Sequence, residues 1–240
     1  MARNAYIQKA LRRVRDFHSL DGIGQPLSVD TLSFQRACIL APHPDDETIG
    51  MGGFLSQYSG QVDVCCVTDG GLGILAKNRD ETASIREREF CAAMEFFGIS
   101  TYRLLAGLDG LMAANRRQLE TVRWDTYDLI ALPNWLDSHR DHVGLSQIIF
   151  ELAADGKIHK NTKILFYEVW STLSLPTHYL DLTQNLHKKI SAINIYESQL
   201  KEINYAKTQF QLAYFRGQMC GVDAAETYTV ITAADLVRLW

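Results

Sequence analysis

The sequence predicts an α/β protein with a Rossmann-like, three-layer α/β/α arrangement around a mostly parallel sheet. Short apolar segments alternate with segments of helical periodicity, which is the order expected of strand–helix–strand units. The short segments are apolar throughout, as is typical of strands that are covered on both faces. The 240 residues, 47% of them hydrophobic, can bury a full core. Because no repeat, linker or low-complexity tract interrupts the chain, we expect one domain over residues 1–240.

Five apolar segments are the predicted strands, at residues 37–41, 62–68, 102–105, 127–132 and 163–169. A helix is predicted over residues 80–97, where Ile85, Ala93 and Phe97 share one face and Gly98 supplies the C-cap. A second helix is predicted over residues 142–154 by the same spacing. Beyond Thr183 a long polar stretch is expected to be helical and to pack on an edge or a face of the sheet.

Composition excludes several classes of protein. Lys+Arg 24 against Asp+Glu 28 gives a net charge of −4, and no basic run is present that could neutralise nucleic-acid phosphates. No apolar stretch approaches the about 20 residues of a membrane span, and no secretory signal pattern is present. Cys65 and Cys66 are neighbours whose side chains would point to opposite faces of a strand. We therefore expect a soluble, cytoplasmic protein with reduced thiols.

Histidine and acidic residues follow two of the predicted strands. "HPDDE" at residues 43–47 comes directly after the first strand, and "HRDH" at residues 139–142 comes after the fourth. Ligand sites in open α/β sheets lie beyond the carboxyl ends of the strands. Ordinary helix starts would also explain the proline and the acids, through a first-turn proline and a Ser138 capping box. Those explanations leave the histidines without a role.

Taken together, the two clusters supply three imidazoles and several carboxylates, which are ligands for a divalent metal. Two imidazoles and one carboxylate with an open fourth position make a catalytic zinc site, whereas a structural site is closed, typically by cysteine. No cysteine lies in either cluster. His139 and His142 are three residues apart, so both could reach one ion if the segment is helical.

The motifs "APHPDDETIGMGG" at residues 41–53 and "HRDH" at residues 139–142 resemble those of the PIG-L/LmbE-like family. Its members are zinc-dependent deacetylases of N-acetylglucosamine-containing compounds. Weaker similarities are "VTDG" at residues 67–70, "SQ" at residues 198–199 and a late "YFRG". The resemblance implies a Zn²⁺ ion and two sets of site residues: the metal ligands His43, Asp46 and His142, and the catalytic residues Asp45, His139 and Asp141.

The implied reaction is hydrolysis of an acetamide on a small amino sugar or sugar conjugate. In this scheme Asp45 is the general base, and a protonated His139 faces the oxygen that gains negative charge, with Asp141 orienting the imidazole. Either Asp45 or His139 could protonate the leaving amine. A homo-oligomer stays open, as does the identity of the N-acetylated substrate.

Two other functions compete with this interpretation. An iron(II) oxygenase also uses two histidines and one carboxylate, but it would leave Asp46 and the carboxylate of "HRDH" without roles. A catalytically silent sugar-binding relative would not need the complete set of site residues that this chain retains.

Several other residues have an open role at this point. Gly50, Gly52 and Gly53 are expected to allow close packing. Arg86 and Arg216 are expected to be solvated or paired with nearby acids, although either could contact an anionic part of a substrate. Trp135 could form a sugar platform or belong to the core. Tyr196 stands where the family often has histidine.

Overall fold

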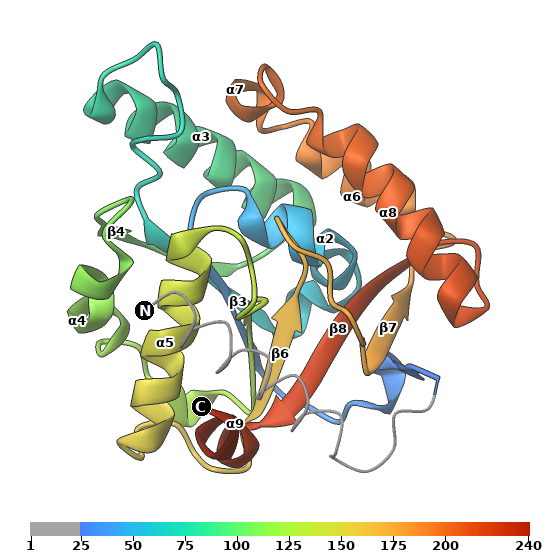
Figure 1. The fold of residues 1–240 in the computed structure, drawn as a ribbon. Helices are drawn as coiled ribbons and strands as arrows, with labels where there is room; N and C mark the ends of the chain where they lie inside the picture. The colour runs from blue at the N-terminus through green and yellow to red at the C-terminus, as the bar shows by residue number, and fades with distance from the viewer. Residues whose placement is uncertain (1–24) are drawn as a thin grey trace, which may run out of the picture.

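The computed structural model describes residues 25–240, which are built around one eight-stranded sheet of order β1-β7-β8-β6-β5-β2-β3-β4 (Figure 1). The strands are β1 (Leu27–Ser28), β2 (Ala37–Ala41), β3 (Val62–Thr68), β4 (Thr101–Gly107), β5 (Leu129–Pro133), β6 (Lys163–Tyr167), β7 (His178–Asp181) and β8 (Ala225–Thr232). The α-helices are α2 (Asp46–Tyr58), α3 (Arg79–Phe97), α4 (Arg116–Leu119), α5 (Arg140–Ala154), α6 (Leu186–Ile193), α7 (Glu197–Leu200), α8 (Tyr205–Cys220) and α9 (Ala233–Leu239).

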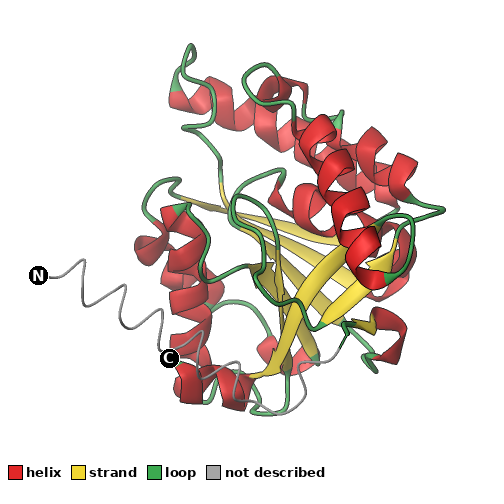
Figure 2. Ribbon diagram, turned by 45° about the vertical axis from the view of Figure 1, so that its right-hand side comes forward, coloured by secondary structure: helices red, strands yellow, loops and turns green. Residues whose placement is uncertain are grey.

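The predicted fold class is confirmed. All strand pairings are parallel except those of β8, which runs antiparallel to both of its neighbours, β6 and β7. Helices cover both faces of the sheet (Figure 2). The single domain over residues 1–240 stays a prediction, and its first 24 residues lie outside the described part of the chain.

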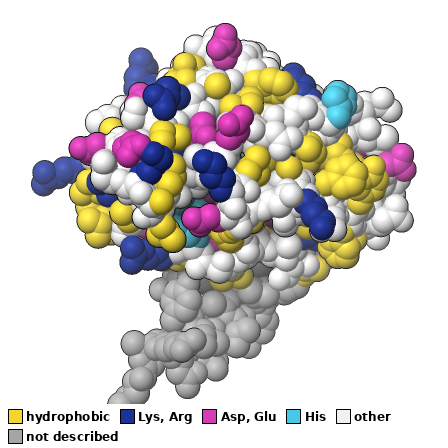
Figure 3. Space-filling model, turned by 90° about the horizontal axis from the view of Figure 1, so that it is seen from above, with side chains coloured by type: hydrophobic (Ala, Val, Ile, Leu, Met, Phe, Trp, Pro, Cys, Tyr) yellow, Lys and Arg dark blue, Asp and Glu magenta, His cyan; other side chains and the backbone are white. Residues whose placement is uncertain are grey.

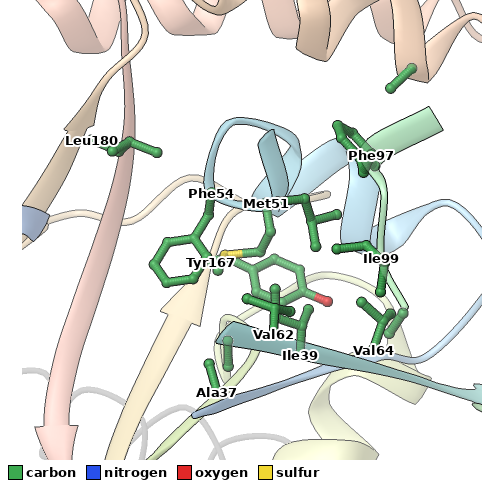
Figure 4. Packing of buried hydrophobic residues seen from close by; sticks show 14 of the residues in the cluster. Ala37, Ile39, Met51, Phe54, Val62, Val64, Phe97, Ile99, Tyr167 and Leu180 are labelled. Carbon is green, nitrogen blue, oxygen red and sulfur yellow. The ribbon is translucent and has the colours of Figure 1, made fainter. Parts of the chain in front are cut away.

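Each face of the sheet has its own apolar core. One core joins α2, α3, α6 and α8 to the sheet, and the other joins α5 and α9 to the opposite face. Cys66 belongs to the first core and Cys65 to the second, as the alternation of strand side chains predicts. All five cysteines are free thiols. Figure 4 shows part of the first core, where the Tyr167 ring lies among Met51, Phe54 and Ile39.

The five predicted strands are all present, within two residues at either end. The two predicted helices begin earlier than expected, at Arg79 and Arg140, and Gly98 is the expected left-handed C-cap. The polar stretch after Thr183 is helical but is divided into α6, α7 and α8. Asn204 starts the last of these, because its side chain accepts the amide N–H of Lys207.

Strand β8 was not predicted. Three of its buried residues are polar, namely Glu226, Thr227 and Thr229, so its sequence lacks the apolar run that marks the other strands. Among the described residues, no helix is both long and apolar enough to cross a membrane.

The strand order reverses direction between β2 and β5, which are neighbours in the sheet. From β2 the chain continues outward to β3 and β4, whereas from β5 it continues the other way to β6. Such a point leaves a crevice at the carboxyl ends of the two strands. The loops that follow β2 and β5 carry the two motifs.

The glycines of α2 allow the close approach that the sequence predicts. A Cβ atom added at Gly50 would lie 2.1 Å from Cδ2 of Tyr167, and one at Gly53 would lie 2.2 Å from Cδ2 of Leu182. Tyr167 cannot easily yield, because it is fully buried and its hydroxyl donates to Leu40 O at 2.7 Å. Helix α2 therefore lies directly on the sheet, with its N-terminus at the crevice.

We expect Gly50→Ala to destabilise the protein. The clash with Tyr167 should cost about 1–3 kcal/mol, more than the gain of up to about 1 kcal/mol in helix propensity. The free energy of unfolding, measured by urea denaturation, should therefore fall by about 1–2 kcal/mol. Gly60→Ala is the matched control, because nothing lies within 4 Å of a Cβ there. Equal stability of the two variants would contradict the close packing.

Candidate functional site

The loop after β2 delivers two of the predicted ligands. Asp46 opens α2, where its carboxylate meets the positive end of the helix dipole. Its Oδ2 accepts the backbone N–H of His43 at 2.9 Å and lies 3.0 Å from His43 Nδ1. Both side chains are buried. The first motif therefore folds back on itself and presents an imidazole and a carboxylate side by side.

The loop after β5 delivers the third predicted ligand. His142 lies in the first turn of α5 and is fully buried, with its Nε2 3.2 Å from Asp46 Oδ2. The N-cap of α5 is His139 rather than Ser138, since His139 Nδ1 accepts the backbone N–H of Asp141 at 3.3 Å. The ring centroids of His139 and His142 are 4.9 Å apart. Both motifs thus meet at one point.

Two of the separations among the three predicted ligands are close to those that a metal ion requires. Two ligands at about 2.0–2.1 Å from a tetrahedral Zn²⁺ lie about 3.3 Å apart. The observed separations from Asp46 Oδ2 to the nearer nitrogens of His43 and His142 are 3.0 and 3.2 Å. Both ring nitrogens of His142 are buried without an aligned hydrogen bond to any described residue. A buried imidazole whose two nitrogens face carboxylates without an aligned hydrogen bond fits a metal ligand.

The other nitrogen of His43 faces two further carboxylates. His43 Nε2 lies 3.3 Å from Asp109 Oδ1 and 3.3 Å from Asp141 Oδ2. These acids are themselves held by the backbone N–H groups of Leu72 and Gly110, at 2.9 and 2.8 Å. A metal-binding histidine usually donates its second N–H to a carboxylate in this way. The arrangement places the proton on Nε2 and leaves Nδ1 for the metal side.

Asp141 therefore contacts a different histidine from the one expected. Its carboxylate lies against His43, and only its backbone N–H reaches the ring of His139. Among the described residues, the groups whose potential ligand atoms all lie within 4.8 Å of one another are His43, His139 and His142, and His43, Asp109 and Asp141; Asp46 is in neither. The geometry alone thus keeps His139 within reach of the ion.

Two acids at the site were missed in the sequence. Asp109 follows β4, and Asp137 lies in the loop after β5, where its Oδ2 is 3.4 Å from His142 Nδ1. Both could have been found by the rule that polar residues beyond strand ends gather at one edge of the sheet.

Asp45 is next to the predicted ligand Asp46 in the chain, but its carboxylate faces Arg86. It is buried, and its Oδ2 is 2.9 Å from Nη2 of Arg86, which also donates to Pro44 O at 2.6 Å. Burial raises the pKa of Asp45 to about 7, even though Arg86 acts in the opposite direction. Arg86 is not solvated, because it is buried at the cavity; it is paired with an acid, but with Asp45 of the loop after β2 rather than with an acid of α3. The loop containing Gly73 packs directly on the guanidinium.

The contacts among Asp46, His142 and His139 shift the pKa values of all three side chains. Burial disfavours the charge of Asp46, yet His142 and His43 hold the pKa of its carboxyl well below the ordinary value. Burial alone would lower the pKa of His142, whereas Asp46 and Asp137 raise it to about 9. Burial and the neighbouring charges of His43 and His142 lower the pKa of His139. Without a metal, protons on His142 thus offset the charge of Asp46.

A cavity of about 220 Å³ opens above these groups. Its wall is completed by side chains from several loops and helices, including Leu72, Trp170, Gln199 and Tyr205. The volume lies below the about 300–1,000 Å³ of pockets for drug-sized ligands, so it encloses only a small group. Seen from above, charges of both signs are interspersed with hydrophobic groups on this face (Figure 3).

Trp135 and Arg216, whose roles the sequence left open, contact the protein interior. Trp135 is 9% exposed and packs edge-on against Phe166, so it belongs to the core. Arg216 is buried in an ion pair with Glu168. The aromatic side chain at the cavity is instead Trp170, which contacts Tyr205 with ring centroids 5.8 Å apart.

Comparisons with known proteins find a family profile and two relatives that are all described as deacetylases. Residues 38–153 match the profile of the PIG-L family, described as GlcNAc-PI de-N-acetylase. A 1D-myo-inositol 2-acetamido-2-deoxy-alpha-D-glucopyranoside deacetylase of Rhodococcus erythropolis is 28% identical over 209 residues, covering 68% of this chain and 67% of the relative. A diacetylchitobiose deacetylase of Thermococcus kodakarensis is 25% identical over 224 residues, covering 80% and 81%.

A solved structure extends the likeness to the fold. The N,N'-diacetylchitobiose deacetylase of Pyrococcus horikoshii, in complex with an inhibitor, aligns with a TM-score of 0.73 and 23% identity. The alignment covers 96% of this chain and 93% of that one. The shared architecture therefore includes the C-terminal helices, which lie beyond the segment matched by the family profile.

We expect the wild-type protein to bind one Zn²⁺ per chain and Asp46→Asn to bind it much more weakly. Asp137→Asn removes a carboxylate behind His142 and should weaken binding by about 10–100-fold, and Asp46→Asn should exceed that loss. Competition with a chromophoric chelator measures both. Asp125→Asn, at an exposed surface position, is the control. Unchanged affinity in Asp46→Asn would remove this residue from the ligand set.

Proposed function

We propose that this chain is a member of the PIG-L family of deacetylases, whose profile matches residues 38–153, and that it is a zinc-dependent enzyme that hydrolyses the N-acetyl group of an N-acetylglucosamine-type sugar or sugar conjugate. The products are acetate and a free amine. The observation that carries the proposal is the meeting of His43, Asp46 and His142 around one point below the cavity. We also propose that the protein works in the cytoplasm, since its five free thiols suit a reducing compartment.

The three ligands would hold the ion, and Asp109, Asp137 and Asp141 would orient the ligand imidazoles from behind. Zn²⁺ bound there supplies Lewis acidity, which polarises an amide carbonyl and makes water nucleophilic near neutral pH. An iron(II) oxygenase is a weaker proposal, because it gives Asp46 no role. The carboxylate of Asp46 contacts the imidazoles of both His43 and His142.

Asp45 is the proposed general base. It lines the cavity next to Asp46, and its ion pair with Arg86 fixes the carboxylate without using both oxygens. It would take the proton of the attacking water and could return it to the leaving amine. Adjacent carboxylates thus divide the work, one holding the ion and one moving the proton.

His139 is the proposed donor to the oxygen that gains negative charge. Its Nδ1 accepts the N–H of Asp141, so the neutral ring carries its proton on Nε2. The ring also lines the cavity. A neutral imidazole can therefore donate a hydrogen bond there, and the protonated form expected from the resemblance is not needed.

The substrate class follows from the cavity and the relatives. The enclosed volume suits an acetamido group and its sugar ring, while the remainder of a conjugate would extend past Trp170 and Tyr205. The named relatives act on a glycoside of a 2-acetamido sugar and on diacetylchitobiose. We propose a small amino-sugar substrate of this kind.

Acetate release from a panel of N-acetylated sugars tests the function. The zinc-loaded protein should release acetate from at least one of N-acetylglucosamine, N,N'-diacetylchitobiose and an N-acetylglucosaminyl inositol. Asp45→Asn should lower kcat by about 10²–10⁴-fold, because the general base is lost. Unimpaired turnover by Asp45→Asn would remove this residue from the base role. Zinc and sugar binding without acetate would indicate a silent relative.

His139→Ala separates the donor role from a ligand role. Loss of one donor to a developing oxyanion costs about 3 kcal/mol, or about 100-fold in kcat. The variant should nevertheless bind one Zn²⁺ per chain with unchanged affinity. Parallel loss of zinc and activity would show that His139 is a ligand.

A further inference from the structure

The backbone of Asp45 adopts a conformation that non-glycine residues rarely occupy. Its φ is 138° and its ψ is −29°. The amide N–H groups of Thr48 and Ile49 donate to Asp45 O at 3.0 and 2.9 Å, so the first turn of α2 is built on this peptide. The conformation lets Asp45 and Asp46 point in different directions. Such a conformation persists only where its surroundings hold it in place.

Glu47 holds the amide side of this strained residue. Its side chain is fully buried, and its Oε2 accepts the backbone N–H of Asp45 at 3.2 Å. Its other oxygen, Oε1, accepts the hydroxyls of Thr48, at 2.6 Å, and Tyr196. Tyr196 is the N-cap residue of α7 and is 2% exposed. It lies outside residues 38–153, which match the family profile.

We propose that Tyr196 is a positioning residue for Asp45, which it orients through the carboxyl group of Glu47. The two hydroxyls fix Oε1, and the rigid carboxyl plane then aims Oε2 at the Asp45 N–H. Without the tyrosine hydroxyl the carboxyl can rotate, and the strained peptide can relax. Arg86 fixes the side chain of Asp45, whereas Tyr196 and Glu47 fix its main chain. The kinetic consequence rests on the proposed function, which makes Asp45 the base.

Tyr228 provides a matched control, because the loss of its hydroxyl tests the effect on stability alone. Tyr228 is also fully buried, and its hydroxyl also donates to a buried glutamate, Glu226. Glu226 in turn accepts the N–H groups of Gly53 and Phe54, one helical turn or more beyond the site. Tyr228→Phe therefore removes the same kind of bond, from a buried glutamate of β8 that accepts N–H groups of α2, without touching Asp45.

Steady-state kinetics compare Tyr196→Phe with Tyr228→Phe, on the panel sugar that the wild type hydrolyses fastest. Tyr196→Phe should lower kcat by about 10–100-fold, the size of effect that misplacing a reacting group by about 1 Å produces. KM and the zinc stoichiometry should stay within about twofold of wild type, because the ligands and the cavity wall are unchanged. Both variants should lose similar thermal stability. The inference is overturned if kcat falls no further in Tyr196→Phe than in Tyr228→Phe.

The amide proton resonance of Asp45 gives a readout that needs no substrate. Loss of the hydrogen bond to Glu47 should move it upfield in Tyr196→Phe and leave it in place in Tyr228→Phe. If Tyr196→Phe does not fold, Thr48→Val removes the other hydroxyl from Oε1 and should give the same shift. An unmoved resonance in the folded variant overturns the inference. If the wild type releases no acetate from any sugar, the proposed function fails, and this resonance still decides the role of Tyr196.

Discussion

The parallel pairing of β2 with β5 is the constraint on which the site depends. Ile39 lies opposite Ala131 in this pairing, so both strands end at the same edge of the sheet. Two loops that are far apart in the sequence therefore open at one point, and helices α2 and α5 begin there with their positive ends toward it. A shift of one residue would turn every side chain of a strand to the other face. The two cores on either side of the sheet thus fix the register that brings His43 to His142.

Several acidic side chains are buried at this edge of the sheet, where each needs a partner for its charge. Buried ions are tolerated only when they are paired or hydrogen-bonded. These buried acids at the site have such partners: Arg86 for Asp45, two imidazoles for Asp46, and backbone N–H groups for Asp109, Asp137 and Asp141. A cation with two positive charges would complete this balance in place of the protons. The arrangement explains why so many acids can share so small a volume.

The sequence predicts the centre of this structure better than its periphery. Residues 37–41 and 62–68 match β2 and β3 because continuous apolar runs have few alternatives to a buried parallel strand. Strand β8 escapes prediction because its buried polar residues, Glu226 among them, interrupt the apolar run; the charge of Glu226 is compensated by Lys189 of α6, 2.9 Å away. At the site, the two motifs mark the predicted metal ligands through their positions after strands, and the structure brings these residues together. The partner Arg86, and the contact of Asp141 with His43, depend on packing between distant segments that no local pattern records.

The cavity wall is divided between two halves of the chain. The predicted ligands and the proposed base come from residues 43–142, whereas Trp170, Gln199 and Tyr205 come from the segments after β6. Homologous enzymes could therefore exchange the later segments as a module and acquire another sugar preference while keeping the chemistry. The buried bond between Tyr196 and Glu47 limits this freedom, because it crosses the junction between the halves. A grafted module would have to bring a hydrogen-bond donor to that position.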